Sequence, residues 1–397
     1  MPSTPPPGDP VPPSGELPAQ ALAELGSRPF GFYVHIPFCA ARCGYCDFNT
    51  YTDLGNMHAA YADAVIAEIE VARRVLGDRD LAIETVFFGG GTPTLLPASE
   101  LGRILGSLQR SFGLAPSAEV TTEANPESVD ARYLAQLRAL GFTRVSFGMQ
   151  SAVPRVLATL ERVHAPGRSQ DCVRWARAEG FEHLSLDLIY GTPGESAADW
   201  QVSIDAALVA EPDHISAYAL IVEEGTRLFT QVSRGELARP ADDELADKYV
   251  QADESFSQAG LAWYEVSNWS VVGGECRHNI GYWRGADWWG AGPGAHSHVG
   301  GVRWWNLRHP AAYADALAAG RSPGQAGEVL GAEDRRTERI LLETRLAAGL
   351  DPAVLAPAGR RAVPALVADG LLTGPAPTLV LTRRGRLLAD LVVRALS

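Results

Sequence analysis

The alternation of strand-like and helix-like segments between residues 31 and 226 constrains the fold of this chain more than any other feature. Six short apolar runs predict β-strands, and they are Phe32–Ile36, Thr85–Phe88, Glu119–Thr122, Arg144–Phe147, Leu184–Ile189 and His214–Leu220. Helix-like stretches separate them, with apolar residues at helical spacing such as Tyr61, Val65 and Ile69. Apolar strands that alternate with helices are typical of a parallel sheet covered by helices. We therefore predict an α/β fold in which residues 28–226 form a partial (β/α)6 barrel.

Three further regions flank the predicted barrel. Residues 1–27 are rich in proline, which disfavours helices and strands, so we expect a disordered tail there. Residues 227–330 mix helix-like runs with a Gly- and Trp-rich stretch and are expected to link the barrel to the C-terminus. In residues 331–397, two amphipathic helices, a β-ribbon at Leu371–Leu381 and a last helix capped by Thr382 resemble a winged helix. The barrel is thus expected to precede a smaller helical region that ends in a winged-helix-like packing unit.

The charge and cysteine content limit the environments in which this chain works. Its formal net charge of -13 argues against sequence-independent binding of nucleic acid, which requires a basic face. No apolar run is long enough to cross a bilayer, and no signal peptide is recognisable. The five cysteines, an odd number with three crowded together, do not have the pattern of a disulfide framework. These features predict a cytoplasmic protein with reduced thiols.

Polar motifs follow five of the predicted strands, each near the strand's carboxyl end. A cysteine-containing loop follows the first strand, and the motifs of the next four are GGGTPT, EANPE, GMQS and DLIYGTPG. In parallel (β/α) folds, the carboxyl ends of the strands carry the functional site. The five motifs are therefore expected to converge on one site at that end of the barrel.

The loop after the first strand contains three cysteines, Cys39, Cys43 and Cys46, in the spacing C-x3-C-x2-C. Among common metal centres, thiolates select zinc or iron–sulfur clusters. A structural zinc site needs four ligands, and the remaining cysteines, Cys172 and Cys276, have no partner at knuckle spacing. A [4Fe–4S] cluster held by three cysteines leaves one iron open to an external ligand. The spacing therefore favours a cluster over zinc.

Together with the Gly-rich loop after the second strand, the cysteine spacing resembles the signature of the radical S-adenosylmethionine superfamily. In that superfamily the amino and carboxylate groups of S-adenosylmethionine chelate the open iron of a [4Fe–4S] cluster, which can then cleave a sulfonium C–S bond. The wider set YVHIPFC, GGGTPT, TEANPE, SFGMQS and DLIYGTPG is similar to the oxygen-independent coproporphyrinogen III oxidase family, over nearly the whole chain after residue 28. The resemblance implies S-adenosylmethionine contacts at Tyr33, Gly90, Gly91, Thr92, Glu123, Gln150, Arg162, Asp187 and Ala219.

The chemistry of these positions agrees with such a ligand. Glycines at 89–91 let backbone amides approach a carboxylate. Glu123 and Asp187 offer carboxylates to an ammonium or to ribose hydroxyls, and Arg162 offers a bidentate clamp for a carboxylate. Each side chain also has an ordinary structural explanation: helix caps for the two acids, a strand-end amide for Gln150 and a solvated helix face for Arg162. Their joint placement at strand ends favours the ligand-binding interpretation.

The segment Arg277–Trp283, RHNIGYW, resembles the haem-associated HNxxYW motif of a haem-chaperone branch of that family. The resemblance implies haem contacts at His278, Asn279, Tyr282 and Trp283. A neutral imidazole suits haem iron, aromatic rings offer flat apolar surface, and in a helix the histidine and the tyrosine would share a face. The alternative is an aromatic patch of the core with structural hydrogen bonds, and Cys276, His296 and His298 are rival iron ligands.

Two features distinguish this chain from the true oxidases of the family. The oxidases carry a fourth cysteine two residues after the third, where this chain has Phe48, and an ordered N-terminal extension, where it has the Pro-rich tail. The resemblance therefore implies a haem chaperone that binds haem as cargo and passes it to an acceptor haem protein, such as one of the respiratory chain. The alternative is a catalytic radical enzyme that decarboxylates coproporphyrinogen III or modifies a porphyrin. The sequence leaves open whether the chain forms a homodimer or docks at a membrane surface.

Overall fold

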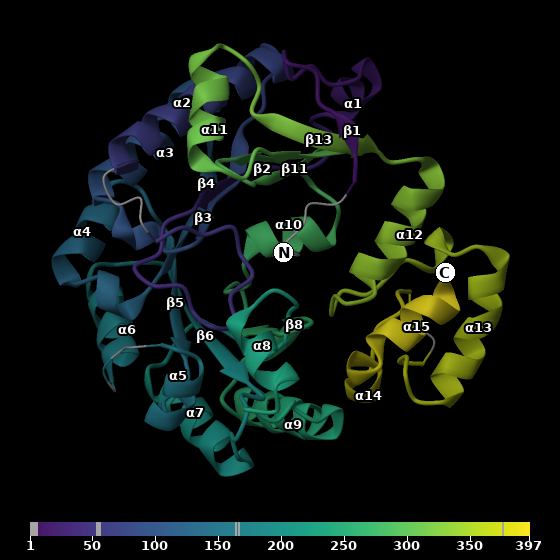
Figure 1. Ribbon diagram of the computed structural model, residues 1–397. Helices are drawn as coiled ribbons and strands as arrows, with labels where there is room; N and C mark the ends of the chain where they lie inside the picture. The colour runs from purple at the N-terminus through teal and green to yellow at the C-terminus, as the bar shows by residue number, and fades with distance from the viewer. Residues whose placement is uncertain (1–6, 53–56, 163–164, 166, 375–376) are drawn as a thin grey trace.

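The computed structural model describes residues 7–52, 57–162, 165, 167–374 and 377–397. The strands of this part of the chain form one sheet, in the order β1-β13-β12-β11-β10-β2-β3-β4-β5-β6-β7-β9-β8. The sheet curves around a concave side on which helix α10 lies, while helices such as α2, α4 and α6 cover its convex side (Figure 1). The C-terminal helices form a lobe beside the open side of this curve (Figure 1).

Six parallel strands form the centre of the sheet and confirm the predicted barrel core. They are β2 (Phe30–Ile36), β3 (Ile83–Gly90), β4 (Leu114–Ala124), β5 (Arg144–Gln150), β6 (His183–Tyr190) and β7 (His214–Ala219). Neighbouring strands pair in sequence order, with Tyr33 opposite Phe87 and Gly148 opposite Asp187. The outermost two, β2 and β7, pair with later strands rather than with each other, so the barrel is partial. The carboxyl ends of all six strands lie at the same edge.

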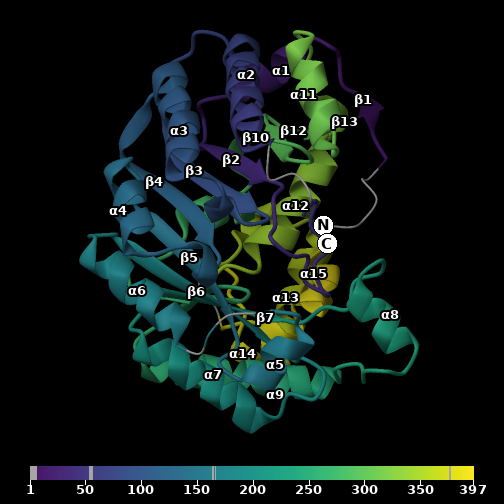
Figure 2. The ribbon, with the colours of Figure 1, turned by 60° about the vertical axis from the view of Figure 1, so that its left-hand side comes forward.

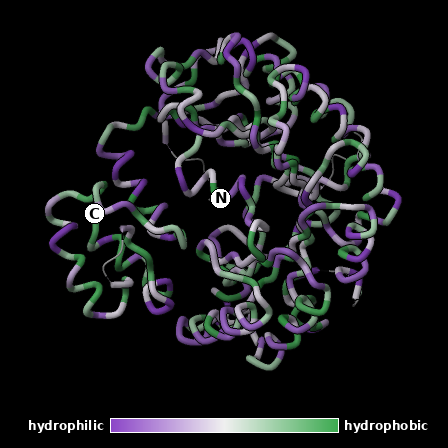
Figure 3. Tube along the Cα trace, turned by 180° about the vertical axis from the view of Figure 1, so that it is seen from behind, coloured by the Kyte–Doolittle hydropathy of each residue, from purple (hydrophilic) through white to green (hydrophobic). Residues whose placement is uncertain are grey.

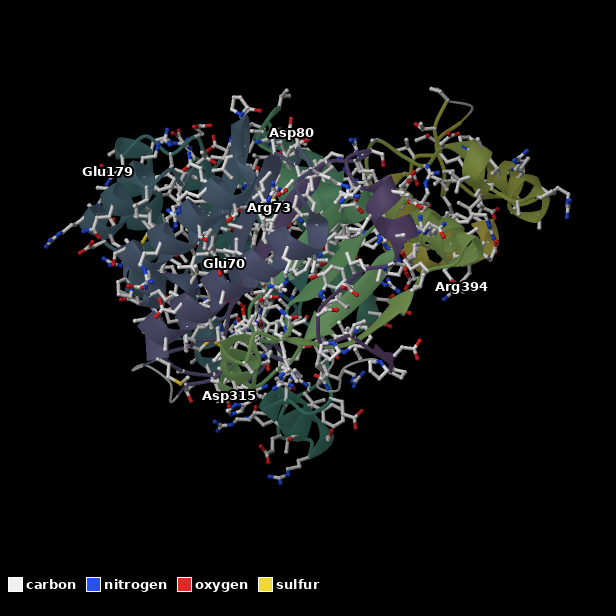
Figure 4. All side chains as sticks on the ribbon, turned by 90° about the horizontal axis from the view of Figure 1, so that it is seen from above. Glu70, Arg73, Asp80, Glu179, Asp315 and Arg394 are labelled. Atoms are coloured by element: carbon white, nitrogen blue, oxygen red, sulfur yellow. The ribbon has the colours of Figure 1, made fainter. Side chains whose placement is uncertain are left out.

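Helices between these strands bury one apolar face against the sheet. They are α2 (His58–Leu76), α3 (Ala98–Phe112), α4 (Ala131–Ala139), α5 (Pro154–Thr159), α6 (Arg168–Ala178) and α7 (Ala197–Val209). In α3, Leu101, Ile104 and Leu108 recur at helical spacing and are fully buried. Helices α2 and α3 lie side by side (Figure 2). Charged residues such as Glu70 and Arg73 of α2 lie on the outside of this layer (Figure 4).

Residues 227–330 extend the sheet at both edges, so the expected linking region is part of the main body. Its elements are α8 (Arg227–Ser233), α9 (Asp242–Gln258), β8 (Ala262–Glu265), β9 (Asn268–Ser270), α10 (Arg277–Trp283), β10 (Asp287–Ala291), β11 (His296–Val299), β12 (Val302–Asn306), α11 (Pro310–Ala318) and β13 (Gly324–Val329). Strand β9 pairs antiparallel with β7, and β10 pairs parallel with β2, with Trp289 opposite Phe32. The Trp-rich stretch therefore continues the parallel sheet beyond its first strand.

The expectation of a disordered N-terminal tail is wrong for the residues that the structure describes. Strand β1 (Asp9–Pro10) pairs antiparallel with β13, and helix α1 (Ala19–Glu24) follows. Ala21 is buried in the main core, and the Glu24 carboxylate accepts a hydrogen bond of 2.7 Å from Nη1 of Arg335. Proline is tolerated in β1 because this strand lies at the edge of the sheet. Residues 1–6 of the expected tail lie outside the described residues.

The C-terminal unit has a hydrophobic core of its own, with Ile340 and Leu350 fully buried. Its helices are α12 (Ala332–Glu343), α13 (Pro357–Ala368), α14 (Arg383–Leu387) and α15 (Ala389–Leu396). Isolated bridges, such as the pairing of Leu372 with Leu381, replace the expected β-ribbon, whose turn at 375–376 lies outside the described residues. The unit is a separate lobe when seen from behind (Figure 3).

The predicted cap of the last helical segment is confirmed. The hydroxyl oxygen of Thr382 accepts a 3.0 Å hydrogen bond from the backbone N–H of Gly385, which satisfies a donor at the start of α14. None of the described helices is long and apolar enough to cross a membrane.

Candidate functional site

The cysteine loop joins β2 to α2 at the carboxyl edge of the sheet. Its three cysteines, Cys39, Cys43 and Cys46, are partly exposed, and none forms a disulfide. The backbone N–H of Cys39 donates to the Tyr51 carbonyl at 3.0 Å. The Asn49 side chain donates to the carbonyls of Pro293 and Arg308, at 3.0 and 2.8 Å. The loop is therefore fastened to the segment between β10 and α11, more than 240 residues along the chain.

Two predicted S-adenosylmethionine contacts reach the cysteine sulfurs. Oγ1 of Thr92 lies 4.0 Å from Sγ of Cys39, and Nη1 of Arg162 lies 3.7 Å from Sγ of Cys43. Burial, together with the neighbouring Cys46, raises the pKa of Cys39 to about 11. This thiol is therefore protonated at neutral pH in the free protein, so binding of a metal centre has to release its proton.

The arrangement of the three cysteines differs from that of a single-ion site. Within the described ranges, no three His, Cys, Asp or Glu side chains are grouped as they would be around one metal ion. A zinc ion requires such convergence, whereas the cysteines of a [4Fe–4S] cluster each bind a different iron. The donor set of three cysteines on one loop thus agrees with a cluster that keeps one iron open.

The Gly-rich loop at the end of β3 packs directly on the cysteine loop. The N–H of Gly91 donates to the Ile36 carbonyl and that of Thr92 to the Phe38 carbonyl, both at 2.7 Å. A Cβ on Gly91 would collide with the Phe38 carbonyl oxygen, so this close approach requires glycine. The prediction that the amides of residues 89–91 face a ligand carboxylate is thus wrong for Gly91, because a backbone carbonyl already accepts its hydrogen bond. The glycines instead seat the cysteine loop on β3.

Two acidic side chains face one another on the concave side. The Glu123 carboxylate accepts a 3.1 Å hydrogen bond from the N–H of Gly90, and both oxygens of Asp187 lie 2.9 Å from Oγ of Ser146. Burial, together with the charge of Asp187, raises the pKa of Glu123 to about 8. Burial also raises the pKa of Asp187. Neither acid caps a helix, and a cationic ligand between them would relieve their repulsion.

Gln150 and Arg162 lie against the end of β5. Gln150 has a left-handed backbone conformation, with φ of 62°, and is buried. Nη2 of Arg162 donates to the Gly148 carbonyl at 3.2 Å, and a Cβ on Gly148 would collide with both side chains. The alternative explanation of Arg162 as a solvated helix residue is therefore excluded. The prediction that it clamps a ligand carboxylate stays open, because its guanidinium also borders Cys43.

Tyr33 connects the predicted ligand contacts to the cysteine loop. Its hydroxyl lies 3.0 Å from Nδ1 of His35, and Nε2 of His35 lies 3.0 Å from the Asn49 carbonyl oxygen. Sequence reasoning missed His35 and Asn49, although the i, i+2 spacing of Tyr33 and His35 on a strand places both on one face. Ala219 ends β7 at the same edge of the sheet. The nine predicted contacts thus lie on strands β2 to β7 or in the segments that follow them, while their binding of S-adenosylmethionine stays a prediction.

Helix α10 confirms the predicted shared face of His278 and Tyr282. Nε2 of His278 lies 2.8 Å from the Tyr282 hydroxyl, and Nδ1 lies 2.8 Å from Oγ1 of Thr85 on β3. The imidazole stacks on the rings of Phe87 and Tyr33, with centroids 5.3 and 6.5 Å apart. Burial lowers the pKa of His278 to about 3. The prediction that this residue contacts haem is untested, and iron ligation would require it to exchange a hydrogen bond.

A buried acid anchors the start of α10. The Glu119 carboxylate accepts hydrogen bonds from the N–H groups of Arg277 and His278, at 3.2 and 3.1 Å. It lies 3.7 Å from Nη1 of Arg144, and both side chains are buried. Sequence reasoning missed Glu119, because it lies on the same strand as the more conspicuous Glu123. An acid at a helix N-terminus stabilises both the orphan amides and the helix dipole.

The remaining residues of the predicted haem segment line the same side of the sheet. Asn279, Tyr282 and Trp283 are partly exposed, and the Trp283 side chain is hydrogen bonded to Glu265. The rival ligand Cys276 is buried, with its thiol 3.7 Å from Oε1 of Glu119. These side chains offer aromatic surface beside the predicted S-adenosylmethionine contacts.

Phe48 is 46% exposed at the position where the oxidases carry a fourth cysteine. The second departure from the oxidases no longer holds, because the described part of the N-terminal segment is ordered. The distinction between the two branches therefore depends on Phe48 and on the HNxxYW helix.

Comparisons with known proteins agree with this geometry. The family model of the radical SAM superfamily matches residues 33–207. The chain is 55% identical to the heme chaperone HemW of Mycobacterium tuberculosis (strain H37Rv), over 96% of this chain and 97% of that protein. It is 33% identical to the heme chaperone HemW of Bacillus subtilis (strain 168), over 91% of this chain and 98% of that protein.

A solved structure shares the fold. The coproporphyrinogen III oxidase HemN from Escherichia coli, a radical SAM enzyme, superposes with a TM-score of 0.82 and covers 95% of this chain and 92% of its own. Its sequence identity of 22% limits the likeness to the fold.

Proposed function

The chain belongs to the HemW family of the radical SAM superfamily, and we propose from this premise that it is a haem chaperone, which binds haem and delivers it to an acceptor protein. Full-length similarity at 55% identity to a heme chaperone HemW supports the proposal. The structural observation that carries it is the position of α10. This helix, which bears the HNxxYW motif, lies on the concave side against β3 and Tyr33, beside the predicted S-adenosylmethionine contacts.

The radical SAM superfamily implies a [4Fe–4S] cluster and S-adenosylmethionine as cofactors. Cys39, Cys43 and Cys46 would hold the cluster, which when bound can donate an electron to S-adenosylmethionine. Glu123 and Asp187 would balance the positive charge of that ligand. Thr92 and Arg162 would hold the sulfurs by hydrogen bonds that favour the thiolate form.

Haem would lie against the aromatic side chains of the segment 278–283 and the neighbouring strands. Tyr282 packs edge-on against Trp288, with centroids 4.6 Å apart, and Trp283 is partly exposed. Flat apolar surface of this kind suits a porphyrin. The acceptor is proposed to be a haem protein, such as one of the respiratory chain, reached from the cytoplasm. An acidic chain with a net charge of -13 makes nucleic acid an unsuitable partner.

One pair of measurements tests the proposal against the oxidase alternative. Reconstituted protein is titrated with haemin, and a second sample receives coproporphyrinogen III, reductant and S-adenosylmethionine under anaerobic conditions. A chaperone binds haemin stoichiometrically and forms no protoporphyrinogen. Catalytic formation of protoporphyrinogen, or failure to bind haemin, would contradict the proposal.

A further inference from the structure

A row of residues crosses the concave side from β12 to β3. In strand order it consists of Trp305, His296, Gly290, Tyr33 and Phe87. Gly290 stands directly opposite Tyr33. A Cβ on it would collide with the backbone of His296. Because glycine brings no side chain, the backbone of His296 can approach β10 closely at this point.

His296 is the residue of this row whose ring is free to bind a metal ion. Its imidazole is partly exposed and stacks on Trp305, with centroids 5.7 Å apart and planes inclined by 28°. Among the residues that the structure describes, neither of its ring nitrogens has a hydrogen-bond partner. Stacking on the indole therefore orients the ring while both nitrogens stay available.

The rings of the other histidines near this row already have hydrogen-bond partners. Both ring nitrogens of His35 are hydrogen bonded, to Tyr33 and Asn49, and so are both nitrogens of His278. Nδ1 of His298 lies 2.9 Å from the Ala286 carbonyl oxygen, and this residue is only 6% exposed. Iron binding at any of them would require the loss of a hydrogen bond or a movement of buried backbone, whereas His296 requires neither.

The electrostatic surroundings of His296 also suit haem. Burial, together with the charges of Arg303 and Arg308, lowers the pKa of His296 to about 4. The imidazole is therefore neutral at physiological pH, which is the form that binds iron.

An aromatic surface continues from this position to α10. The ring of His298 lies 5.1 Å from that of Trp288, which in turn lies 4.6 Å from that of Tyr282. We propose that His296 supplies the axial nitrogen to the iron of the haem cargo and that the macrocycle lies along Tyr33 and Tyr282. The inference rests on the proposed haem-carrying function. It assigns the HNxxYW helix the role of an aromatic surface rather than that of the iron ligand.

The test compares ferric haem spectra and affinities of variants with those of the full-length wild-type protein. In His296→Ala, the Soret band should shift and the affinity for haemin should fall at least about 10-fold, while added imidazole should restore the wild-type spectrum. His183→Ala is the matched control, because His183 is another partly exposed histidine, at the amino end of β6, whose ring has no hydrogen bond among the described residues. This control should bind haemin as the wild type does.

Two further results separate the ligand assignment from the function. If the wild-type protein binds haemin and the Soret band of His296→Ala is unchanged, only the assignment of His296 as the iron ligand is overturned. Wild-type protein that fails to bind haemin would overturn the proposed function as well. If His296→Ala does not fold, His296→Met keeps the volume of the side chain and replaces the nitrogen by a thioether. Its spectrum should then change to that of a sulfur-ligated or five-coordinate haem, and an unaltered spectrum would again reject His296.

Discussion

The hydroxyl of Tyr282 lies 2.8 Å from Nε2 of His278, and the opposite nitrogen of the same ring lies 2.8 Å from Oγ1 of Thr85. Because burial keeps the imidazole neutral, one nitrogen donates a hydrogen bond while the other accepts one. This chain of hydrogen bonds fixes the HNxxYW helix to strand β3, next to the predicted S-adenosylmethionine contact Tyr33. The helix is thus part of the interior of the barrel and not a surface attachment.

Removal of the Tyr282 hydroxyl should destabilise the protein. In Tyr282→Phe, a buried imidazole nitrogen loses its partner, which should cost about 1–3 kcal/mol in the free energy of unfolding. Urea denaturation measures this change. The double variant His278→Phe, Tyr282→Phe removes both partners of this hydrogen bond. It should recover part of the free energy of unfolding that Tyr282→Phe loses. Wild-type stability of Tyr282→Phe would show that the hydrogen bond contributes nothing.

Gly91→Ala should displace the cysteine loop. The added methyl group would collide with the Phe38 carbonyl oxygen, so either β3 or the loop has to move. We expect less iron per chain after reconstitution, measured by a colorimetric iron assay. Gly106→Ala is the control, because Gly106 lies within α3, where alanine is favoured by about 1 kcal/mol. Equal iron contents in the two variants would contradict a role of Gly91 in seating the loop.

The sequence predicted the parallel core of the fold because its signal is local. Runs such as Leu184–Ile189 are rich in apolar residues and are followed by turn residues, so each strand is recognisable without its neighbours. The pairing of β10 with β2 is not local, since it joins residues about 257 apart in sequence. The strand character of the short N-terminal segment Asp9–Pro10 depends likewise on β13. Proline composition alone therefore indicated a disordered tail.

The same distinction applies to the candidate site. The residue types of Cys39, Glu123 and Asp187 indicate their chemistry, and the strand ends give their approximate place. No sequence pattern shows that the nitrogens of His278 are consumed by Thr85 and Tyr282, because these partners come from the tertiary fold.

Each of the three loop cysteines should be necessary for the cluster. In Cys39→Ala, Cys43→Ala or Cys46→Ala, the reconstituted iron content and the broad absorption near 400 nm should fall to background. Cys172→Ala is the control, because Cys172 is buried in α6 with its thiol 3.5 Å from the Pro126 carbonyl oxygen, away from the loop. Retention of full iron in any of the three loop variants would refute the assignment of the cluster.

The pH dependence of stability should report the environment of Glu123. Its pKa in the folded protein is about 8, above the unfolded value of about 4.3, so the folded state binds the proton more tightly. Folding is therefore favoured at low pH, and the free energy of unfolding should fall as the pH rises from about 4 to about 8. In Glu123→Gln this contribution is absent. The stability of the variant relative to wild type should rise by roughly 1–3 kcal/mol between pH 5 and pH 8, measured by urea denaturation without S-adenosylmethionine.

The predicted pH dependence of stability can be checked directly. A relative stability that stays constant across this pH range would show that Glu123 has an ordinary pKa. The backbone N–H of Gly90 keeps an acceptor in Glu123→Gln, since the amide oxygen can replace the carboxylate oxygen. The comparison therefore measures the charge rather than the loss of the hydrogen bond.

A buried ion pair joins the C-terminal unit to α9. Both terminal nitrogens of Arg386 bind the carboxylate of Asp253 on α9, at 2.8 and 2.9 Å, and the guanidinium lies over the ring of Trp263. Removal of one partner leaves a buried charge, which costs about 3–5 kcal/mol in other proteins. Here Arg383 also contacts Asp253 at 2.8 Å, so the loss in Arg386→Met should be smaller, about 2–3 kcal/mol.

Limited proteolysis provides the second measurement for this pair. Arg386→Met should release the C-terminal unit faster than wild type, because α14 loses its strongest contact with α9. Arg339→Met is the matched control, since Arg339 forms an exposed i, i+4 pair with Glu343, worth about 0.3–0.5 kcal/mol. Equal cleavage rates and equal urea midpoints for the two variants would show that the unit is held by its apolar contacts instead. A selective effect of Arg386→Met would show that the ion pair contributes to holding the C-terminal unit on α9.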